Sequence, residues 1–290
     1  MYARMLTTVL GRVTIAAIVA LSFAAGIFLV ALWSVHDAIY YEPALKVAYF
    51  SIDSVGAQSA IIFDQATGEV IAEKNSTAVR PIASVTKLLT AAMFYEHADL
   101  DATTSIAWSD VNTEGAAGRL HANEVYGYRE LLFPLLLESS NDAASAMLRI
   151  EPDLLTQMRA YAASLGLSQT SFADPSGLSK ENVSTASELA ILARALYERE
   201  PHIFDITRLD LYIGTHTGWL NNDPMEKKEG FAGGKHGYTE EADRTGIAFF
   251  TEHLESGQER TIGYVLLGSE DLSADIDALR AGVRSHVRME

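Results

Sequence analysis

The sequence predicts one α/β domain in which helices flank a mostly antiparallel sheet, together with one N-terminal transmembrane helix. Three observations predict the domain. A hairpin pattern opens it at 57–75, the middle third at 126–196 is mostly helical, and two strand patterns close it within 245–269. The helical segment lies between the two groups of strands in the sequence. Its helices must bury their apolar sides against a sheet, so we expect both groups of strands to share one sheet.

Composition narrows the function before any motif is read. The chain has 290 residues, 48% of them hydrophobic, which is enough for a buried core. Its net charge of -16 argues against nucleic acid as a partner, because phosphate binding needs clustered Lys and Arg. Cysteine is absent and the histidines lack metal-ligand spacing, so we expect no metal and no cofactor.

An uncharged apolar run from 13 to 35 is long enough to cross a membrane as a helix. The basic residues Arg4 and Arg12 precede it, which predicts that residues 1–12 stay in the cytoplasm. A cleaved signal peptide is the alternative, but the run is longer than the usual hydrophobic region and lacks a small-residue cleavage site. We therefore expect an uncleaved anchor in the bacterial cytoplasmic membrane, a connector at 36–56 and an extracytoplasmic domain at 57–290.

Each element of the domain has its own signal. Within 57–75, two β-rich runs flank a turn at Gly68. Apolar residues at helical spacing then follow Ser84, and Pro134 is expected to kink or end the next helix. The remaining expected elements are helices at 142–150, 154–167 and 185–198, strands at 245–252 and 261–269, and a last helix at 273–287.

A serine needs a neighbouring base before its hydroxyl becomes a nucleophile, and "SVTK" supplies one. Ser84 and Lys87 are three residues apart, so a helix would place both side chains on one face. Burial of that face would lower the pKa of the lysine and leave a neutral amine that can accept a proton. The alternative is an ordinary Ser cap beside a solvent-facing Lys.

Two further motifs weigh against that alternative. "ESSNDAAS" offers Ser139 and Asn141 in a break between helices, and "GGKHG" offers Lys235 on an expected strand. The Lys235–His236 pair does not match a phosphate loop, since Glu229 stands at its first glycine position. A catalytic histidine is disfavoured because G-x-S-x-G is absent. S-x-x-K, S-x-N and K-[ST]-G, in this order, are the motif set of penicillin-binding proteins and serine β-lactamases, and here His236 stands at the middle position of the third motif.

Residues from about 57 to 285 therefore resemble the D-alanyl-D-alanine carboxypeptidases, low-molecular-mass penicillin-binding proteins that work as serine peptidases. The likeness covers "DQATGEVIAEKN", "PIASVTKLLTA", the middle segment from "MRAYAASLGL" to "ILARAL", and "GFAGGKHGYTEEA". It implies a β-lactamase/transpeptidase-like fold. It also implies hydrolysis of peptidoglycan stem peptides ending in D-Ala-D-Ala, and a part in cell-wall biogenesis and cell shape. Muropeptides would be the substrates and β-lactams the inhibitors.

The resemblance also implies a role for each motif residue. Ser84 would attack the penultimate carbonyl, Lys87 would accept its proton, and Ser139 would relay a proton to the leaving D-alanine. Asn141 and Lys235 would bind substrate, and Asn141 would also orient the base. His236 and Gly237 would also bind substrate. The backbone N–H groups of Ser84 and Tyr238 would form the oxyanion hole.

The chain departs from the family pattern where a terminal carboxylate would be held. His236 stands where the family has Thr or Ser, and 261–279 lacks the arginine that many members carry after the last strand. If charged His236 binds the carboxylate, KM for a D-Ala-D-Ala peptide should rise above pH ~6.5. The family's extra C-terminal β-rich domain and C-terminal membrane helix have no counterpart in the sequence.

Four functions follow from this reading. A D,D-carboxypeptidase is the first, and a D,D-endopeptidase that cuts crosslinks by the same mechanism is the main alternative. A β-lactamase is disfavoured because "EPDLL" at 151–155 comes too soon after Ser139 to be its deacylation loop. A receptor for penicillin or peptidoglycan that acylates without turnover is the non-enzymatic option.

Overall fold

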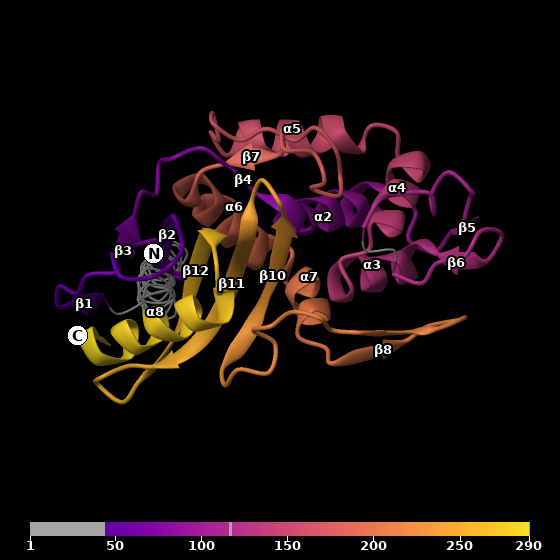
Figure 1. The fold of residues 1–290 in the computed structure, drawn as a ribbon. Helices are drawn as coiled ribbons and strands as arrows, with labels where there is room; N and C mark the ends of the chain where they lie inside the picture. The colour runs from indigo at the N-terminus through magenta and orange to yellow at the C-terminus, as the bar shows by residue number, and fades with distance from the viewer. Residues whose placement is uncertain (1–43, 116–117, 290) are drawn as a thin grey trace, which may run out of the picture. The chain divides into compact units, whose positions relative to one another are not determined.

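The computed structural model describes residues 44–115 and 118–289, and its centre is a five-stranded antiparallel sheet (Figure 1). The strand order is β10-β11-β12-β2-β3. The two predicted groups of strands, at 57–75 and within 245–269, therefore meet in one sheet, as the sequence predicts. The strands are β2 (Ser59–Asp64), β3 (Val70–Lys74), β10 (Phe231–Thr239), β11 (Asp243–His253) and β12 (Glu259–Ser269).

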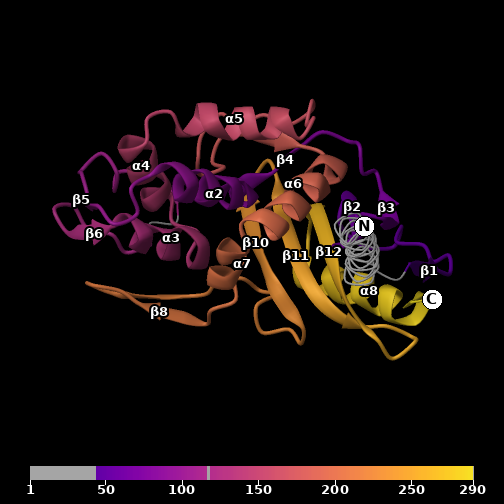
Figure 2. The same ribbon diagram turned by 180° about the vertical axis from the view of Figure 1, so that it is seen from behind.

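Both faces of this sheet are buried, because neighbouring residues of a strand belong to two different apolar clusters. Phe63 and Phe249 belong to one apolar cluster, with the helices of the middle third. Their neighbours Ile62 and Phe250 belong to a second cluster, under the last helix α8. Because successive side chains of a strand point to opposite faces, the near-continuous apolar runs of β2, β11 and β12 are those of a sheet covered on both sides. Figures 1 and 2 show α8 on one face and α6 and α7 on the other.

The helices follow the predicted order. Four predicted helices are confirmed near their expected bounds, as α4, α5, α6 and α8. The described residues also form a short helix, α7, and four two-stranded sheets that the sequence does not predict. The helices are α2 (Lys87–His97), α3 (Tyr128–Leu137), α4 (Asn141–Ile150), α5 (Leu154–Ser164), α6 (Ala186–Arg199), α7 (Pro201–Thr207) and α8 (Leu272–His286). The small strands are β1 (Leu45–Val47) with β13 (Val287–Met289), β4 (Arg80–Pro81) with β7 (Val183–Ser184), β5 (Thr103–Ser105) with β6 (Val125–Gly127), and β8 (Leu211–Ile213) with β9 (Gly218–Leu220).

Two local expectations change in the structure. The helix that Ser84 was expected to open begins as a single 3₁₀ turn, η1 (Ala83–Thr86), and becomes α-helical only at Lys87. Pro134 lies inside α3, which continues to Leu137. A proline removes one backbone donor, and near the end of a helix only one hydrogen bond is lost.

The chain enters the fold before residue 57. Lys46 pairs with Arg288 in the β1–β13 register, and Ile52 and Val55 are buried in the cluster under α8. Residues 45–56 are thus part of the folded unit, whereas the sequence assigns them to a connector. The pairing joins three-residue strands from opposite ends of the chain, and such short strands give no alternation pattern.

The predicted membrane-spanning segment 13–35 lies outside the described residues. Among residues 44–115 and 118–289, the structure contains no helix that is both long enough and apolar enough to span a bilayer.

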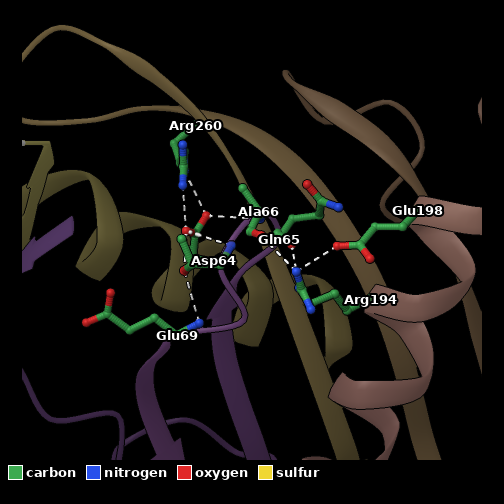
Figure 3. A network of polar contacts seen from close by, with 8 residues as sticks. Asp64, Gln65, Ala66, Glu69, Arg194, Glu198 and Arg260 are labelled. Carbon is green, nitrogen blue, oxygen red and sulfur yellow. Dashed lines mark hydrogen bonds and ion pairs between the residues drawn. The ribbon is translucent and has the colours of Figure 1, made fainter. Parts of the chain in front are cut away.

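A buried ion pair fixes the β2–β3 turn to the sheet (Figure 3). Asp64 is 0% exposed and accepts two hydrogen bonds from Arg260 of β12, at 2.8 and 2.7 Å. Although burial raises the pKa of Asp64, the bonds from Arg260 and Thr67 outweigh it and hold that pKa below 3.8. On the other side of the turn, Arg194 of α6 donates to the carbonyls of Gln65 and Ala66 at 2.8 Å. The turn therefore joins the sheet to α6 through two arginines.

Replacing Arg260 by methionine should lower the free energy of unfolding by ~3–5 kcal/mol, because it leaves the Asp64 carboxylate buried without its cation. Urea denaturation at pH 7 measures this change. The matched control is Arg208→Met, since the Arg208–Asp205 pair is exposed on both sides and should contribute less than ~1 kcal/mol. The wild-type contribution is present above pH ~4 and is lost as pH falls through the lowered pKa of Asp64. Equal losses in the two variants would contradict this account.

Candidate active site

Ser84 is presented by a strained turn. The residue before it, Ala83, has φ +49°, a left-handed conformation that costs an L-residue ~1–2 kcal/mol. A Cβ at Gly177 would lie 1.9 Å from the Ala83 carbonyl oxygen, so only glycine allows this close approach. A distant loop thus holds the backbone just before the predicted nucleophile.

Lys87 is buried and makes three polar contacts. Its side chain is 0% exposed, and Nζ lies 2.8 Å from Ser84 Oγ, 2.9 Å from Asn141 Oδ1 and 2.6 Å from the Ser176 carbonyl oxygen. The alternative of a Ser cap beside a solvent-facing lysine is therefore wrong.

The surroundings of Lys87 suit it to act as a base for Ser84. The amide oxygen of Asn141 and the carbonyl of Ser176 can only accept, so they take two N–H groups of Nζ. Burial lowers the pKa of Lys87 well below 10.5, the charge of Lys235 adds to this, and Asp174 partly opposes it. In its neutral form the amine has two N–H groups and one lone pair, so it can bond both acceptors and still take the proton of the Ser84 hydroxyl, whose Oγ lies 2.8 Å away. The geometry is that of a serine with its general base in place.

Asn141 is the first residue of α4, and its orientation is fixed from both ends. While Oδ1 accepts from Lys87, Nδ2 donates to the Glu114 carbonyl oxygen at 2.6 Å. Ser139 lies two residues earlier, 8% exposed and with φ +61°, so the break between α3 and α4 is a sharp turn. A cavity of about 480 Å³ opens beside Asn141, and Leu148 and Leu178 contribute to its largely apolar wall.

The loop at 173–182 completes the surroundings of Lys87, and the motif search did not select it. Asp174 accepts from the backbone N–H groups of Ser176, Gly177 and Ser179, each at 2.7 Å. These bonds, with that of the Ser176 hydroxyl, outweigh burial and lower the pKa of Asp174 below 3.8. Asn182 is 0% exposed and donates to Thr86 Oγ1 at 3.1 Å, next to Lys87. The run "DPSG" is a turn signal inside the helical third and could have marked the loop.

Strand β10 forms the other wall of the site. A Cβ at Gly237 would lie 2.6 Å from the Ser84 backbone nitrogen, so the strand edge runs directly against the nucleophile and needs glycine there. Lys235 is 1% exposed, and burial lowers its pKa from 10.5 to about 8 despite the opposing charge of Asp223. Its Nζ donates to the His236 carbonyl oxygen at 2.7 Å.

His236 and Tyr238 lie at the same edge. Burial lowers the pKa of His236 below 6.5, with Lys235 adding to this shift and Asp223 opposing it. Any change in KM that follows its protonation should therefore fall below pH 6.5 rather than above it. The Tyr238 side chain is 59% exposed, and Arg244 lies 5.6 Å from the centre of its ring. The assignment of the oxyanion hole to the N–H groups of Ser84 and Tyr238 stays a prediction.

The structure thus gathers the predicted residues from three separate segments. Ser84, Lys87 and Asn141 are in direct contact, and Gly237 brings β10 against Ser84. A buried lysine bonded to a serine one turn earlier, completed by an asparagine and set beside a sheet edge, defines the active-site-serine class of penicillin-binding folds.

Comparison with known proteins places the chain within this class. The family model described as D-alanyl-D-alanine carboxypeptidase matches residues 46–267. This match covers most of the chain, which therefore belongs to that family.

Similar proteins carry two related names. A D-alanyl-D-alanine endopeptidase of Pseudomonas aeruginosa is 33% identical over 165 residues, which are 55% of this chain and 53% of the relative. The chain thus spans about half the length of that relative. A D-alanyl-D-alanine carboxypeptidase of Mycobacterium tuberculosis is 31% identical over 199 residues, 65% of this chain and 68% of the relative. A crystal structure of a D-alanyl-D-alanine carboxypeptidase from M. tuberculosis has a TM-score of 0.73 at 26% identity and covers 83% of this chain and 95% of its own.

Proposed function

We propose that this protein is a serine D,D-peptidase that hydrolyses peptidoglycan stem peptides through an acyl-enzyme on Ser84. One observation carries the proposal: the buried amine of Lys87 lies 2.8 Å from the Ser84 hydroxyl, and its other two polar contacts are with the acceptor oxygens of Asn141 and Ser176. Membership of the D-alanyl-D-alanine carboxypeptidase family supports the substrate class.

In the acylation step, Lys87 Nζ takes the hydroxyl proton while Ser84 Oγ attacks the carbonyl carbon of the penultimate D-alanine. The negative charge that develops on the carbonyl oxygen is held by backbone N–H groups at Ser84 and at Tyr238, and one such donor is worth ~3 kcal/mol of barrier. The C–N bond then breaks, and the leaving nitrogen receives, through Ser139, the proton that Lys87 took from Ser84, which returns Lys87 to its neutral form.

In the deacylation step, water donates a proton to the neutral Lys87 and attacks the ester on Ser84. The acid product leaves and the serine is restored. Lys235, with its pKa of about 8, is mostly charged at neutral pH and stabilises negative charge beside the strand. A β-lactam would acylate Ser84 by the same first step, since its strained amide replaces the scissile bond.

A D,D-carboxypeptidase and a D,D-endopeptidase differ only in the leaving residue. In the first it is a terminal D-alanine, and in the second it belongs to a crosslinked neighbouring stem. The sequence favours the carboxypeptidase, and relatives carry both names. The endopeptidase is the second candidate because His236 takes the place of a hydroxyl donor at the strand edge.

Incubation with uncrosslinked and crosslinked muropeptides, followed by mass spectrometry of the products, tests this function. Loss of one D-alanine from the uncrosslinked pentapeptide indicates the carboxypeptidase, and conversion of dimers to monomers indicates the endopeptidase. Stable acyl-protein without released product would identify a receptor and overturn the proposal.

We propose that the segment 13–35 anchors the chain in the cytoplasmic membrane with the peptidase domain outside. Support for this comes from the sequence, in which the run is uncharged and follows Arg4 and Arg12. Fractionation of the full chain, with and without this segment, tests the anchor.

A further inference from the structure

Asp223 is a buried carboxylate beside the active site to which neither the motifs nor the mechanism above gives a role. Its side chain is 6% exposed and lies in the loop between β9 and β10. Oδ1 accepts from the Met225 backbone N–H at 2.9 Å, while Oδ2 lies 3.5 Å from Nδ1 of His236. The carboxylate thus stands directly behind the imidazole at the strand edge.

The two facing atoms identify where the imidazole proton is. Neither Oδ2 of Asp223 nor Nδ1 of His236 has a hydrogen-bond partner elsewhere in the described chain, and both are buried. An unprotonated Nδ1 would set its lone pair against a carboxylate oxygen, which is repulsive in a dry site. Nδ1 therefore carries the proton, and in the neutral ring Nε2 is a hydrogen-bond acceptor.

The charge states at neutral pH follow from the surroundings. Burial, Lys235 and Lys87 lower the pKa of His236 below 6.5 against the pull of Asp223, so the imidazole is neutral. Burial raises the pKa of Asp223, but His236 and Lys235 outweigh it and keep that pKa below 3.8, so the carboxylate is charged. Nε2 of His236 therefore presents a lone pair, and the negative charge of Asp223 lies beside the Nδ1 of the same ring.

The leaving residue of a substrate reaches this position. His236 follows the buried Lys235 and precedes Gly237, which lies against the Ser84 nitrogen. A peptide that binds along the strand edge advances at most ~3.5 Å per residue, so the residue beyond the scissile bond ends beside His236. Arg244, on the neighbouring strand, is held by the Glu270 carbonyl oxygen at 2.9 Å and by the Tyr238 ring.

We propose that Asp223 and His236 select the leaving residue, with Asp223 as a positioning residue that keeps Nδ1 protonated and Nε2 of His236 as an acceptor for substrate. The preferred leaving residue donates an N–H from its carboxyl end, as a carboxamide or a peptide bond does. A free carboxylate there meets a lone pair and the negative charge of Asp223. This inference rests on the proposed peptidase function and names the substrate class of that site, and at neutral pH it favours the second candidate, the endopeptidase, over the carboxypeptidase.

The preference depends on pH. Protonation of His236 turns Nε2 into a charged donor, which suits a carboxylate. Because the pKa of His236 is lowered, the charged form dominates only at a pH below that lowered value, and hence below 6.5. The value of kcat/KM for carboxylate substrates should therefore rise at a pH below the pKa of His236. The value of kcat/KM for amide substrates should be higher at neutral pH.

We call Asp223 and His236 together the selector. Two synthetic stem pentapeptides test it with the full chain. They differ only in the last D-alanine, which carries a free carboxylate in one peptide and a carboxamide in the other. The readout is the ratio of kcat/KM for the amide to that for the acid, from pH 5 to 8. For the wild type we expect a ratio of about ten or more at pH 7.5, falling towards acid pH. His236→Thr should favour the acid at all pH values, because a hydroxyl can donate to a carboxylate.

Asp223→Asn should lower the ratio and move its pH break to lower pH, because the carboxylate that favours protonated His236 is gone. A purely structural role of Asp223 would not move that break. His253→Thr is the matched control, since His253 is 60% exposed at the far end of β11 and should leave the ratio unchanged.

Labelling of Ser84 by a fluorescent penicillin separates failure of the selector from failure of the proposed function. If the wild type is labelled and hydrolyses the peptides but its ratio equals that of His236→Thr, the selector is wrong and the peptidase stands. If the wild type is neither labelled nor active on either peptide, both proposals fall. Thermal unfolding of His236→Thr checks that this variant is folded.

Discussion

Replacing Ser84 by alanine is expected to abolish labelling by a fluorescent penicillin and to reduce peptide hydrolysis by a factor on the order of 10⁴ or more. In the proposed mechanism the removed Oγ is the atom that bonds to substrate, and within the described residues the hydroxyl of Ser139 has no comparable contact with Lys87. The measurements are gel fluorescence of the labelled chain and product formation by mass spectrometry. Alanine fits the 3₁₀ turn without strain, so the fold should be retained.

The control for this variant is Ser164→Ala, at an exposed serine on α5 that hydrogen-bonds only to the Tyr161 carbonyl oxygen. It should be labelled like the wild type. Persistent labelling of Ser84→Ala would show that another residue is the nucleophile and would remove the assignment.

Replacing Lys87 by arginine is expected to slow acylation by ~10³–10⁴-fold while keeping the positive charge available. A guanidinium is protonated at every accessible pH and has no lone pair to accept the Ser84 proton. The measurement is the rate of penicillin labelling. Lys227→Arg, at a lysine whose side chain is 79% exposed, is the matched control and should react at the wild-type rate.

The wild-type acylation rate should also rise with pH through the lowered pKa of Lys87. Its neutral form is the base, and that form is populated above a pKa that lies well below 10.5. The Arg variant should lose this dependence. A variant that keeps the wild-type rate and pH profile would exclude Lys87 as the base. Thermal unfolding of both variants checks that the larger guanidinium is accommodated.

The predictable part of the site is the part encoded by local spacing. Ser84 and Lys87 lie one turn apart, and Lys235 and Gly237 share a strand, so short stretches of sequence indicate them. The burial that gives Lys87 its chemistry is not local. Its other two partners, Asn141 and Ser176, are 54 and 89 residues away along the chain.

Asp223 is a second case in which the sequence alone does not indicate a residue of the site. It is a single acidic residue in a loop, with no periodicity to mark it, and only the tertiary fold places it behind His236. For the fold as a whole, strands and helices with strong periodicity are predicted near their bounds. The three-residue pairing of β1 with β13 is missed because strands that short show no pattern.

The approach of Gly177 to the Ala83 carbonyl has a consequence for how this protein acquires its reactivity. In an unfolded chain Ala83 is free of its left-handed conformation, and Lys87 is solvated with an ordinary pKa of ~10.4 and hence protonated at neutral pH. Ser84 then has no base. In the proposed mechanism, reactivity appears only when the loop at 173–182 docks on the turn, so an unfolded polypeptide is unreactive toward β-lactams. Covalent labelling accordingly doubles as a folding assay for variants that leave the site intact, such as Ser164→Ala and Lys227→Arg.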